Sequence, residues 1–450
     1  MSRNQRLFLI AALNDNVPFG SDAAMATGQT WKLKQYFRAN AFGWRASALA
    51  STRLKQALAE IQKVGRKDAI LAAEGALSLA ERLWPALAGV DTSSGALGSA
   101  VHRATIQLVS VIIKPEVDVV IRARWMERLY DAVQNDGVDY LARIQNHWGE
   151  LCVYTELANQ WADKLLPGVR DCWTASPPQF AKDAVMALSA LLKAARHDDI
   201  STLLELQRTR FWHYDQFRAE SLVRQGRIDE ALELAQSIGV DPHANAGMGW
   251  VVFCERVLLD AGRRDEAYRR FAGMATSATT NTMWVRRVLE KYPERQPRSV
   301  LMDLMASGAK GKWFAAAKDA GFMDIALECA ADHCADPATL VRAVRDFGET
   351  DPEFAMRVAA SAIKGLLHGS GYDPETGDVV RAYHYGMAAA AKIEKQADFE
   401  QTLRALDREG AVADRRMMLD ALRHCLRTGP DNIANVVAMV EAGPKHLRRH

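Results

Sequence analysis

One local pattern returns along the second part of this 450-residue chain, and it restricts the folds open to the chain. Each copy holds the end of an apolar helix, a small residue, a short turn with an acid, and the start of a second helix. Clear copies lie at residues 222–234 (LVRQGRIDEALEL), 258–271 (LLDAGRRDEAYRRF), 317–327 (AKDAGFMDIAL) and 393–403 (IEKQADFEQTL), and a looser one at 191–203 (LLKAARHDDISTL). The pattern predicts pairs of antiparallel helices.

The residue types in each copy explain the turn. In the first clear copy, Gly226 can adopt the left-handed conformation that ends a helix. Asp229 then falls in the first turn of the next helix, where the positive end of the helix favours a carboxylate. Ala231 is small, so the two helices can approach closely. The matching residues of the next two copies are Gly262, Asp265, Ala267, Gly321, Asp324 and Ala326.

The spacing of these turns resembles the tetratricopeptide repeat, nominally about 34 residues long. The turns fall near residues 195, 226, 262, 321 and 397, so the first intervals are 31 and 36. Phe271 fits a later aromatic position of that family. Its small residue in the first helix is Ala219 in one unit but Glu255 and Phe314 in the next two, so the array is degenerate. The longer intervals leave room for extra helix pairs around 280–307 and 336–391.

The resemblance implies an all-α fold, an α-α superhelix or solenoid of antiparallel helix pairs, preceded by a basic helical region. No stretch alternates polar and apolar residues over a useful length, so a β-sheet has little support. We predict three parts: a basic, aromatic-rich region at 1–70, a helical domain at 71–175, and the repeat array at 176–450. The last boundary rests on the proline- and glycine-rich segment 166–179. Earlier helices are expected at 68–87, 99–113, 117–134, 136–146 and 149–165. Residues 28–45 and 311–321 also resemble stretches of an uncharacterised bacterial family, which implies no activity.

Basic charge is concentrated near the N-terminus. Residues 31–70 carry nine Lys and Arg against two acids, a net charge of +7, whereas residues 71–450 have a net charge of −5. Cations neutralise phosphates and aromatic faces stack on bases, so this segment suits nucleic acid. Its rings would equally suit core anchors, with the cations on a solvated face or against an acidic partner. The candidate contact residues are Lys32, Lys34, Arg38, Arg45, Arg53 and Lys55.

A second group of aromatic residues stands at 211–217, flanked by arginines. Trp, Tyr and Arg are favoured as anchors of protein interfaces, so part of this group could line a groove. Packing between helix pairs is the alternative, since neighbouring rings cannot all face one way. The candidate groove residues are Arg208, Arg210, Trp212, Tyr214 and Arg218.

We find no catalytic signature in the sequence. Segment 307–312 lacks the spacing of a phosphate-binding loop, and segment 369–378 lacks that of a calcium loop. Cys329 and His333 would share a helix face beside Cys334, but a closed zinc site needs four ligands. We expect no metal and no cofactor, and we expect a buried Cys pair beside a surface histidine.

The cysteines and the apolar runs of the sequence indicate the cellular compartment. Six scattered cysteines form no disulfide framework, which favours a reducing cytoplasm. The apolar run at 7–13 is at the short limit for a signal peptide. We expect no membrane span, since none of the apolar runs approaches roughly 18 residues.

Three functions remain open. The first is a cytoplasmic, bacterial-type adaptor or scaffold without catalysis, which binds a protein partner along a helical groove. The second is a nucleic-acid-binding protein whose basic N-terminal region contacts phosphates while the solenoid recruits a partner. The third is an enzyme whose site assembles from distant residues.

Overall fold

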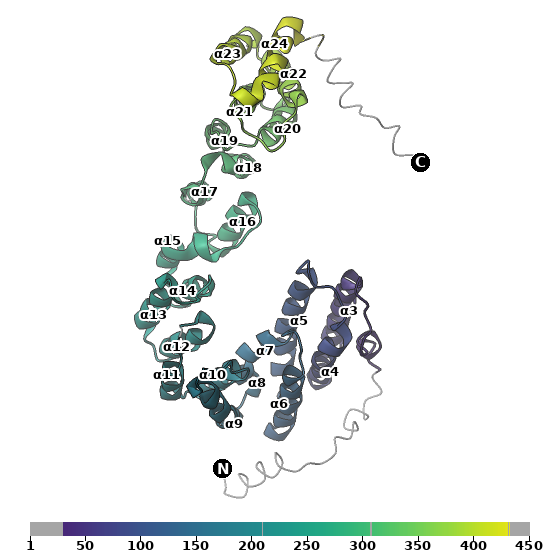
Figure 1. Cartoon of the computed structure of the whole chain (residues 1–450), viewed down its shortest axis with the longest axis vertical. Coiled ribbons are helices and arrows are strands. Elements are labelled where there is room, and N and C mark those ends of the chain that lie inside the picture. Colours follow the sequence, from purple (N-terminus) through teal and green to yellow (C-terminus); the bar gives the residue numbers. More distant parts are fainter. Residues whose placement is uncertain (1–29, 209, 307, 431, 433–450) are drawn as a thin grey trace, which may run out of the picture. The chain divides into compact units, whose positions relative to one another are not determined.

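The computed structural model describes residues 30–208, 210–306, 308–430 and 432, and Figure 1 shows them as a succession of helices. Among these residues there is no strand, only an isolated bridge between Phe211 and Asn245. The all-α prediction is therefore confirmed. The predictions for residues 7–13 and 14–28 fall outside the described residues. The chain divides into two compact units, Met1–Val257 and Leu258–His450, which we describe separately.

The first unit begins with helices that mostly match those expected. They are α2 (Leu33–Tyr36), α3 (Ser47–Gly65), α4 (Ala69–Leu87), α5 (Ala96–Ile113), α6 (Val119–Gln134), α7 (Ala142–Asn146), α8 (Trp148–Cys152) and α9 (Thr155–Thr174). The expected helix at 136–146 shrinks to α7 because the Asp136 carboxylate accepts hydrogen bonds from the backbone N–H groups of Val138 and Leu141 and holds a loop there. The expected helix at 149–165 is split by Val153, whose φ is +61°.

A buried arginine closes the end of α5. Arg122 is fully buried and donates to the carbonyl oxygens of Ile112 at 2.6 Å and Pro115 at 2.8 Å. Ile112 belongs to the last turn of α5, whose carbonyls the helix leaves without partners, and Pro115 follows shortly after the helix. Burial lowers the pKa of Arg122. The polar contacts of this side chain thus replace the helical bonds that Pro115 interrupts.

Helix α5 is long and apolar enough to cross a membrane by length and composition, with a mean hydropathy of 1.4. One face of this helix, however, belongs to the core of the first unit. Leu97, Val101, Leu108 and Ile112 are buried there, and the helix packs on α3 and α4. A core helix passes the same test of composition, so α5 is weak evidence for a membrane span.

The segment expected to separate domains is partly helical. Helix α9 continues through Pro167 to Thr174, and the connection to the next helix contains a cis peptide bond before Pro177. One hydrophobic core runs from Trp31 to Phe217, across residues 70 and 175. The three predicted parts therefore stay a prediction about independent folding, while the contacts divide the chain at residue 257.

Five helix pairs carry the repeat. They are α10 (Ala184–Lys193) with α11 (His197–Glu205), α12 (Trp212–Arg224) with α13 (Ile228–Val240), α14 (Gly249–Asp260) with α15 (Arg264–Ala275), α18 (Phe314–Asp319) with α19 (Met323–Ala330), and α22 (Thr376–Lys392) with α23 (Gln396–Glu409). Each turn contains one residue of positive φ: Ala195, Gly226, Gly262, Gly321 and Glu394. The predicted turn near 397 thus centres on Glu394.

All five turns share one hydrogen-bond pattern. The residue after the positive-φ position donates its N–H to the carbonyl five residues earlier, at 2.8–3.0 Å, as Arg227 does to Leu222. The positive-φ residue itself bonds to the carbonyl three residues earlier. This is the Schellman ending of a helix. The recurring sequence pattern therefore encodes one recurring backbone geometry, as predicted.

Helices also fill the longer intervals between turns. Residues 280–307 hold α16 (Asn281–Lys291) and α17 (Pro297–Met305), and residues 336–391 hold α20 (Pro337–Phe347) and α21 (Pro352–Leu367) before α22. The remaining elements are η2 (Lys310–Trp313), η3 (Ala413–Arg415) and α24 (Arg416–Thr428).

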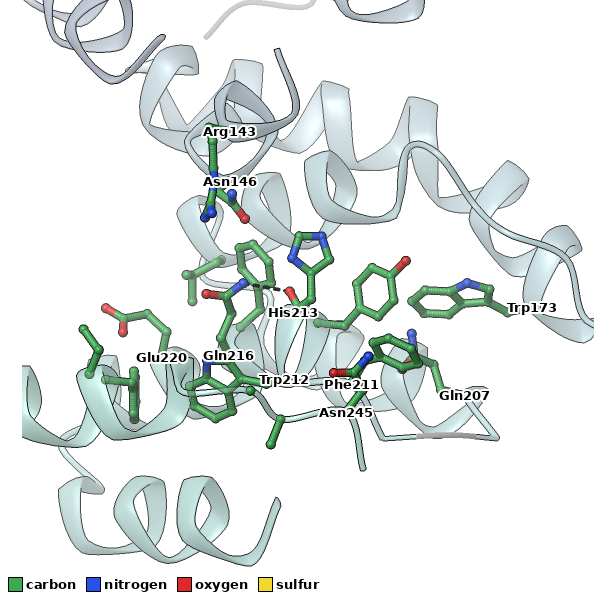
Figure 2. Close-up of a pocket in the computed structure, with 18 of the residues that line it drawn as sticks. Arg143, Asn146, Trp173, Gln207, Phe211, Trp212, His213, Gln216, Glu220 and Asn245 are labelled. Carbon is green, nitrogen blue, oxygen red and sulfur yellow. Dashed lines mark hydrogen bonds between the residues drawn. The ribbon is translucent and has the colours of Figure 1, made fainter. Parts of the chain in front are cut away.

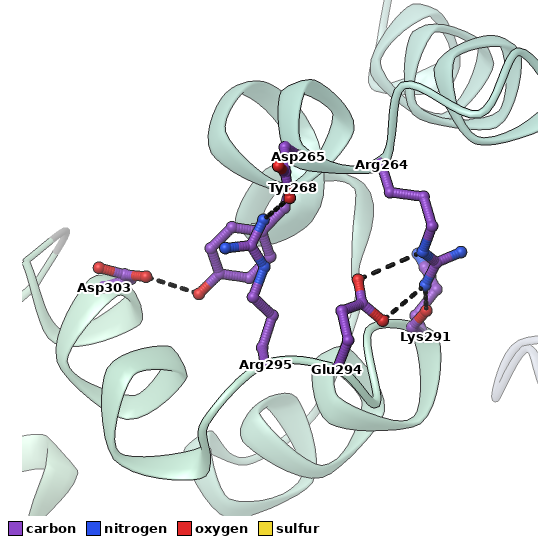
Figure 3. Close-up of polar contacts among 7 residues, drawn as sticks. All are labelled: Arg264, Asp265, Tyr268, Lys291, Glu294, Arg295 and Asp303. Carbon is purple, nitrogen blue, oxygen red and sulfur yellow. Dashed lines mark hydrogen bonds and ion pairs between the residues drawn. The ribbon is translucent and has the colours of Figure 1, made fainter.

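Side chains join successive helices in the second unit (Figure 3). Asp265 opens α15, as expected for an acid at a helix start, and also pairs with Arg295 at 2.5 Å. The Arg295 guanidinium lies over the Tyr268 ring, and the Tyr268 hydroxyl donates to Asp303 of α17 at 2.6 Å. Burial and this bond raise the pKa of Tyr268. The acid of the repeat therefore also ties its helix to the next pair.

Candidate functional site: an aromatic groove in the first unit

A groove of about 1200 Å³ lies in the first unit, and Figure 2 shows part of its lining. Its walls come from α7, α8 and the end of α9, from α12, and from the first turns of α14. We call it the aromatic groove, after the rings that line it: Trp173, Phe180, Phe211, Trp212, Tyr214, Phe217 and Phe253.

Backbone contacts fix the two loops that border the aromatic groove. The N–H of Asn245 donates to the Arg210 carbonyl at 3.0 Å, and the N–H of Trp212 donates to the Asn245 carbonyl at 3.2 Å. Arg210 also grips the buried carboxylate of Asp215 with two hydrogen bonds, at 3.1 and 3.2 Å. A bidentate pair of this kind fixes orientation as well as adding energy. The start of α12 is therefore held rigidly against the loop before α14.

The opposite wall is held by α10. The Ser189 hydroxyl accepts from the N–H of Gly149 at 3.0 Å and donates to the Asn146 carbonyl at 2.8 Å. A Cβ on Gly149 would lie 2.2 Å from the Ser189 carbonyl oxygen, so only glycine allows α8 this close to α10. This contact positions α7 and α8, which carry Arg143 and Glu150 into the aromatic groove.

The rings form a row with one anchor beneath it. His213, Tyr214 and Trp173 follow one another with ring centroids 5.2 and 5.4 Å apart, and Phe211 joins Tyr214 at 6.3 Å. Trp212, which is buried, instead packs against the rest of the unit.

The ring centroid of this anchor, Trp212, lies 5.3 Å from that of Phe253. The indole also lies over Gly249, where a Cβ would be 2.5 Å from it. Phe180 is 81% exposed and Phe211 also reaches the surface. The groove therefore presents accessible rings on a packed base.

The acids of the aromatic groove already have partners. Glu220 pairs with Arg256 at 2.6 Å, and Glu150 lies 2.8 Å from His147. The bond from His147 is the largest influence that lowers the pKa of Glu150.

Most of the arginines in the aromatic groove, unlike its acids, have no partner of opposite charge in an ion pair among the described residues. Arg143, Arg208 and Arg224 line the groove with exposed side chains, and none of them forms an ion pair within the described part of the chain. The unneutralised charge of the groove is therefore positive.

One end of the row combines a cation with groups that can exchange hydrogen bonds. Figure 2 shows Arg143 and Asn146 on the side of the groove that faces His213. Partial burial and the charge of Arg143 lower the pKa of His213. The Asn146 side-chain oxygen is buried, and it has no hydrogen-bond partner among the described residues. This end of the groove (Figure 2) is suited to a ligand that brings an anionic group to Arg143 and a hydrogen-bond donor to the Asn146 side-chain oxygen.

Sequence reasoning found part of the groove. Arg208, Trp212 and Tyr214 line it, whereas Arg210 instead holds Asp215 and Arg218 donates to the Ser201 carbonyl at 3.0 Å. Trp173 and the other missed lining residues come from segments far apart in the chain. No local spacing marks them, because tertiary packing alone brings them together. These missed residues include Arg143, Phe180 and Phe253.

The N-terminal segment divides its residues between the core and the surface. Trp31, Phe37 and Phe42 are core residues, while Trp44 is 67% exposed. Most of the candidate cations are exposed: Lys32, Lys34, Arg38, Arg45 and Lys55. Arg53 is half-buried, with its guanidinium 4.1 Å from the centroid of the Tyr36 ring. The segment therefore buries most rings and presents its charges.

The candidate metal residues are arranged differently from the expectation. Helix α19 ends at Ala330, so His333 lies beyond it in an exposed turn and does not share a helix face with Cys329. Cys329 is buried, which raises the pKa of its thiol to about 11. Cys334 is half-buried, with its Sγ 3.2 Å from His333 Nε2. Donor atoms of Asp332, His333 and Cys334 lie within 4.8 Å of one another, three consecutive residues on the surface.

Comparisons with known proteins identify no family for this chain. No family model matches the chain, and a search of curated proteins returns no match. A solved structure described as a circular tandem repeat protein with novel repeat topology and enhanced subunit contact surfaces is 13% identical, with 88% of this chain and 92% of that chain covered. Its TM-score is 0.17, so the similarity carries no argument about function. The repeat assignment rests on the five turns themselves.

Proposed function

We propose that this protein is a non-catalytic adaptor or scaffold of the cytoplasm that binds a protein partner in the aromatic groove. The observation that supports the proposal is a row of rings on a rigid base, with Phe180 and Phe211 exposed beside it and, at its border, arginines that form no ion pair among the described residues. Aromatic and arginine side chains of this kind carry most of the energy of protein interfaces. Repeat folds often present such surfaces, an argument by analogy that only adds to the first.

Site-specific photo-crosslinking tests the proposal. A photoreactive phenylalanine analogue replaces Phe180 or Phe211, and the control carries it at Tyr372, which is 100% exposed in the second unit. We expect a discrete protein to be captured from both groove positions and not from position 372. Capture should disappear when Tyr214→Ser and Arg143→Glu are added. The same set of proteins at all three positions would reject the proposal.

The third function, an enzyme, has its best candidate in the same groove. His147 and Glu150 form an acid–base pair with a 2.8 Å separation. A His147→Gln variant separates the two functions, because it removes proton transfer and keeps a polar side chain. Loss of partner capture is not expected from this change.

Nucleic-acid binding is the second candidate, and the exposed cations of residues 30–55 beside exposed Trp44 favour it. Fluorescence anisotropy against single-stranded DNA, duplex DNA and RNA at two salt concentrations tests it. Binding that weakens steeply with salt and disappears when Lys32, Lys34, Arg38 and Arg45 become Glu would support it. The control is Arg269→Glu with Arg286→Glu, two exposed cations of the second unit, compared with the Lys32→Glu, Lys34→Glu pair of the same charge change. Absence of binding at low salt would remove this candidate.

A further inference from the structure

The proposed function leaves the chemistry of the partner open, and the charges of the aromatic groove narrow it. We infer that the groove selects an extended, acidic peptide segment that carries an aromatic side chain near its acids. This inference rests on the proposed function of the groove.

The first argument is the balance of charge. Both acids that line the groove have partners: Glu220 pairs with Arg256, and Glu150 bonds to His147 and lies in the field of Arg224 and Lys193, which lowers its pKa. Arg224 donates to the Leu192 carbonyl at 3.0 Å and faces Glu150, whereas Arg143 and Arg208 carry charge that no carboxylate of the described residues pairs with. A partner that brings carboxylates would complete charge-assisted hydrogen bonds, whereas a basic partner would meet uncompensated like charge.

The second argument is the order of the groups. Arg143 faces His213 (Figure 2), and burial together with this charge lowers the pKa of His213. The His213 ring meets the Tyr214 ring at a tilt, and Tyr214 in turn meets Trp173 edge-on. Each step between neighbouring rings is 5.2–5.4 Å, less than the rise of about two residues in an extended chain. A carboxylate at Arg143 and a ring among Tyr214 and Trp173 can thus come from one short segment.

The lining also discriminates between two anionic partners. A single-stranded nucleic acid combines negative charge with stacking bases, as this groove requires. Its phosphates form an uninterrupted line of charge, however, and each of the two walls also holds a carboxylate, Glu150 of α8 and Glu220 of α12. A peptide can place its few acids opposite the arginines and neutral residues opposite the glutamates, so a peptide fits better.

Selection from a phage-displayed library of random 12-residue peptides on the full-length protein tests the inference. Selected peptides are then synthesised, and their dissociation constants are measured by anisotropy. We expect Asp or Glu close to Trp, Tyr or Phe among the selected sequences. The expected loss is about tenfold or more for Arg143→Glu with Arg208→Glu and for Phe180→Ser with Phe211→Ser, all of which are exposed residues whose replacement should leave the melting temperature unchanged. Arg269→Glu with Arg286→Glu is the charge control.

The outcomes separate the inference from the proposed function. Basic or uncharged peptides that lose affinity in the Phe180→Ser, Phe211→Ser variant would overturn the acidic class while the groove stays a peptide site. A 20-residue deoxythymidine strand that displaces the selected peptides and binds more tightly would overturn the peptide class. Selected peptides whose affinity none of the groove variants changes would overturn both the inference and the proposed function.

Discussion

Two segments of the first unit share a composition and differ in what they expose. Residues 30–55 and 208–218 both interleave aromatic rings with Lys and Arg. In the first segment, Trp31, Phe37 and Phe42 are buried and the cations cover the surface. In the second, Phe211 and Tyr214 line a groove while Arg210 turns inward to Asp215. Composition therefore indicates that a segment is important to packing or binding, and the neighbouring helices decide which.

The difference has a local cause in both segments. Each places one tryptophan against a glycine of another helix, Trp31 on Gly75 of α4 and Trp212 on Gly249 of α14. In the N-terminal segment, Phe37 and Phe42 pack on each other 5.6 Å apart beside that anchor. In the second segment, Tyr214 has its neighbours Trp173 and His213 in the groove wall and stays half-buried there.

The largest expected effect comes from removing the buried anchor of the N-terminal segment. Trp31→Ala should lower the free energy of unfolding by about 3–5 kcal/mol, because it leaves a cavity in the core. Trp44→Ala, at an exposed ring of the same segment, should change it by less than about 0.5 kcal/mol. Urea unfolding followed by circular dichroism measures both. Equal losses would contradict the division of this segment into buried and exposed rings.

A smaller effect is expected from the glycine beneath that anchor. A Cβ at Gly75 would lie 2.5 Å from the Trp31 ring, so Gly75→Ala should destabilise by about 1–2 kcal/mol despite its better helix propensity. The control is Gly98→Ala in α5, where a Cβ meets open space. That change should stabilise by up to about 1 kcal/mol. Thermal unfolding gives both signs, and a stabilising Gly75→Ala would show that Trp31 does not need this contact.

The same contrast explains which features of the structure could be predicted from the sequence. The turns were predictable because Gly226, Gly262 and Gly321 encode their conformation locally. The extra helix pairs followed from the intervals between those turns. The aromatic groove was predictable only in part, since Trp212 and Tyr214 belong to one helix whereas Arg143 and Trp173 reach it from others. His333 lies on the surface as expected, but its predicted place on one helix face with Cys329 was wrong because α19 ends three residues before it, at a boundary that no cap residue in the sequence marks.

The smallest expected effects on stability concern the backbone of the two turns on either side of residues 208–218, the groove segment. Gly226 has a φ of +77° and open space around its Cβ position, so Gly226→Ala isolates the cost of the left-handed conformation. We expect a loss of about 1 kcal/mol. Ala195 holds a φ of +57°, and its N–H bonds to the Leu192 carbonyl at 3.3 Å, longer than the 2.9 Å of the matching bond at Gly226. Ala195→Gly should therefore stabilise by up to about 1 kcal/mol.

The N-terminal segment supplies the control for this pair of variants. Asn40 has a φ of +54°, and asparagine already tolerates the left-handed region, so Asn40→Gly should leave the melting temperature nearly unchanged. Differential scanning calorimetry of the three variants gives the order Ala195→Gly above Asn40→Gly above Gly226→Ala. If Ala195→Gly were instead destabilising, the looser copy of the repeat would not share the backbone geometry of the glycine turns. The groove segment would then lie between two different kinds of helix ending, and the row of rings at His213, Tyr214 and Trp173 would owe its position to tertiary contacts alone.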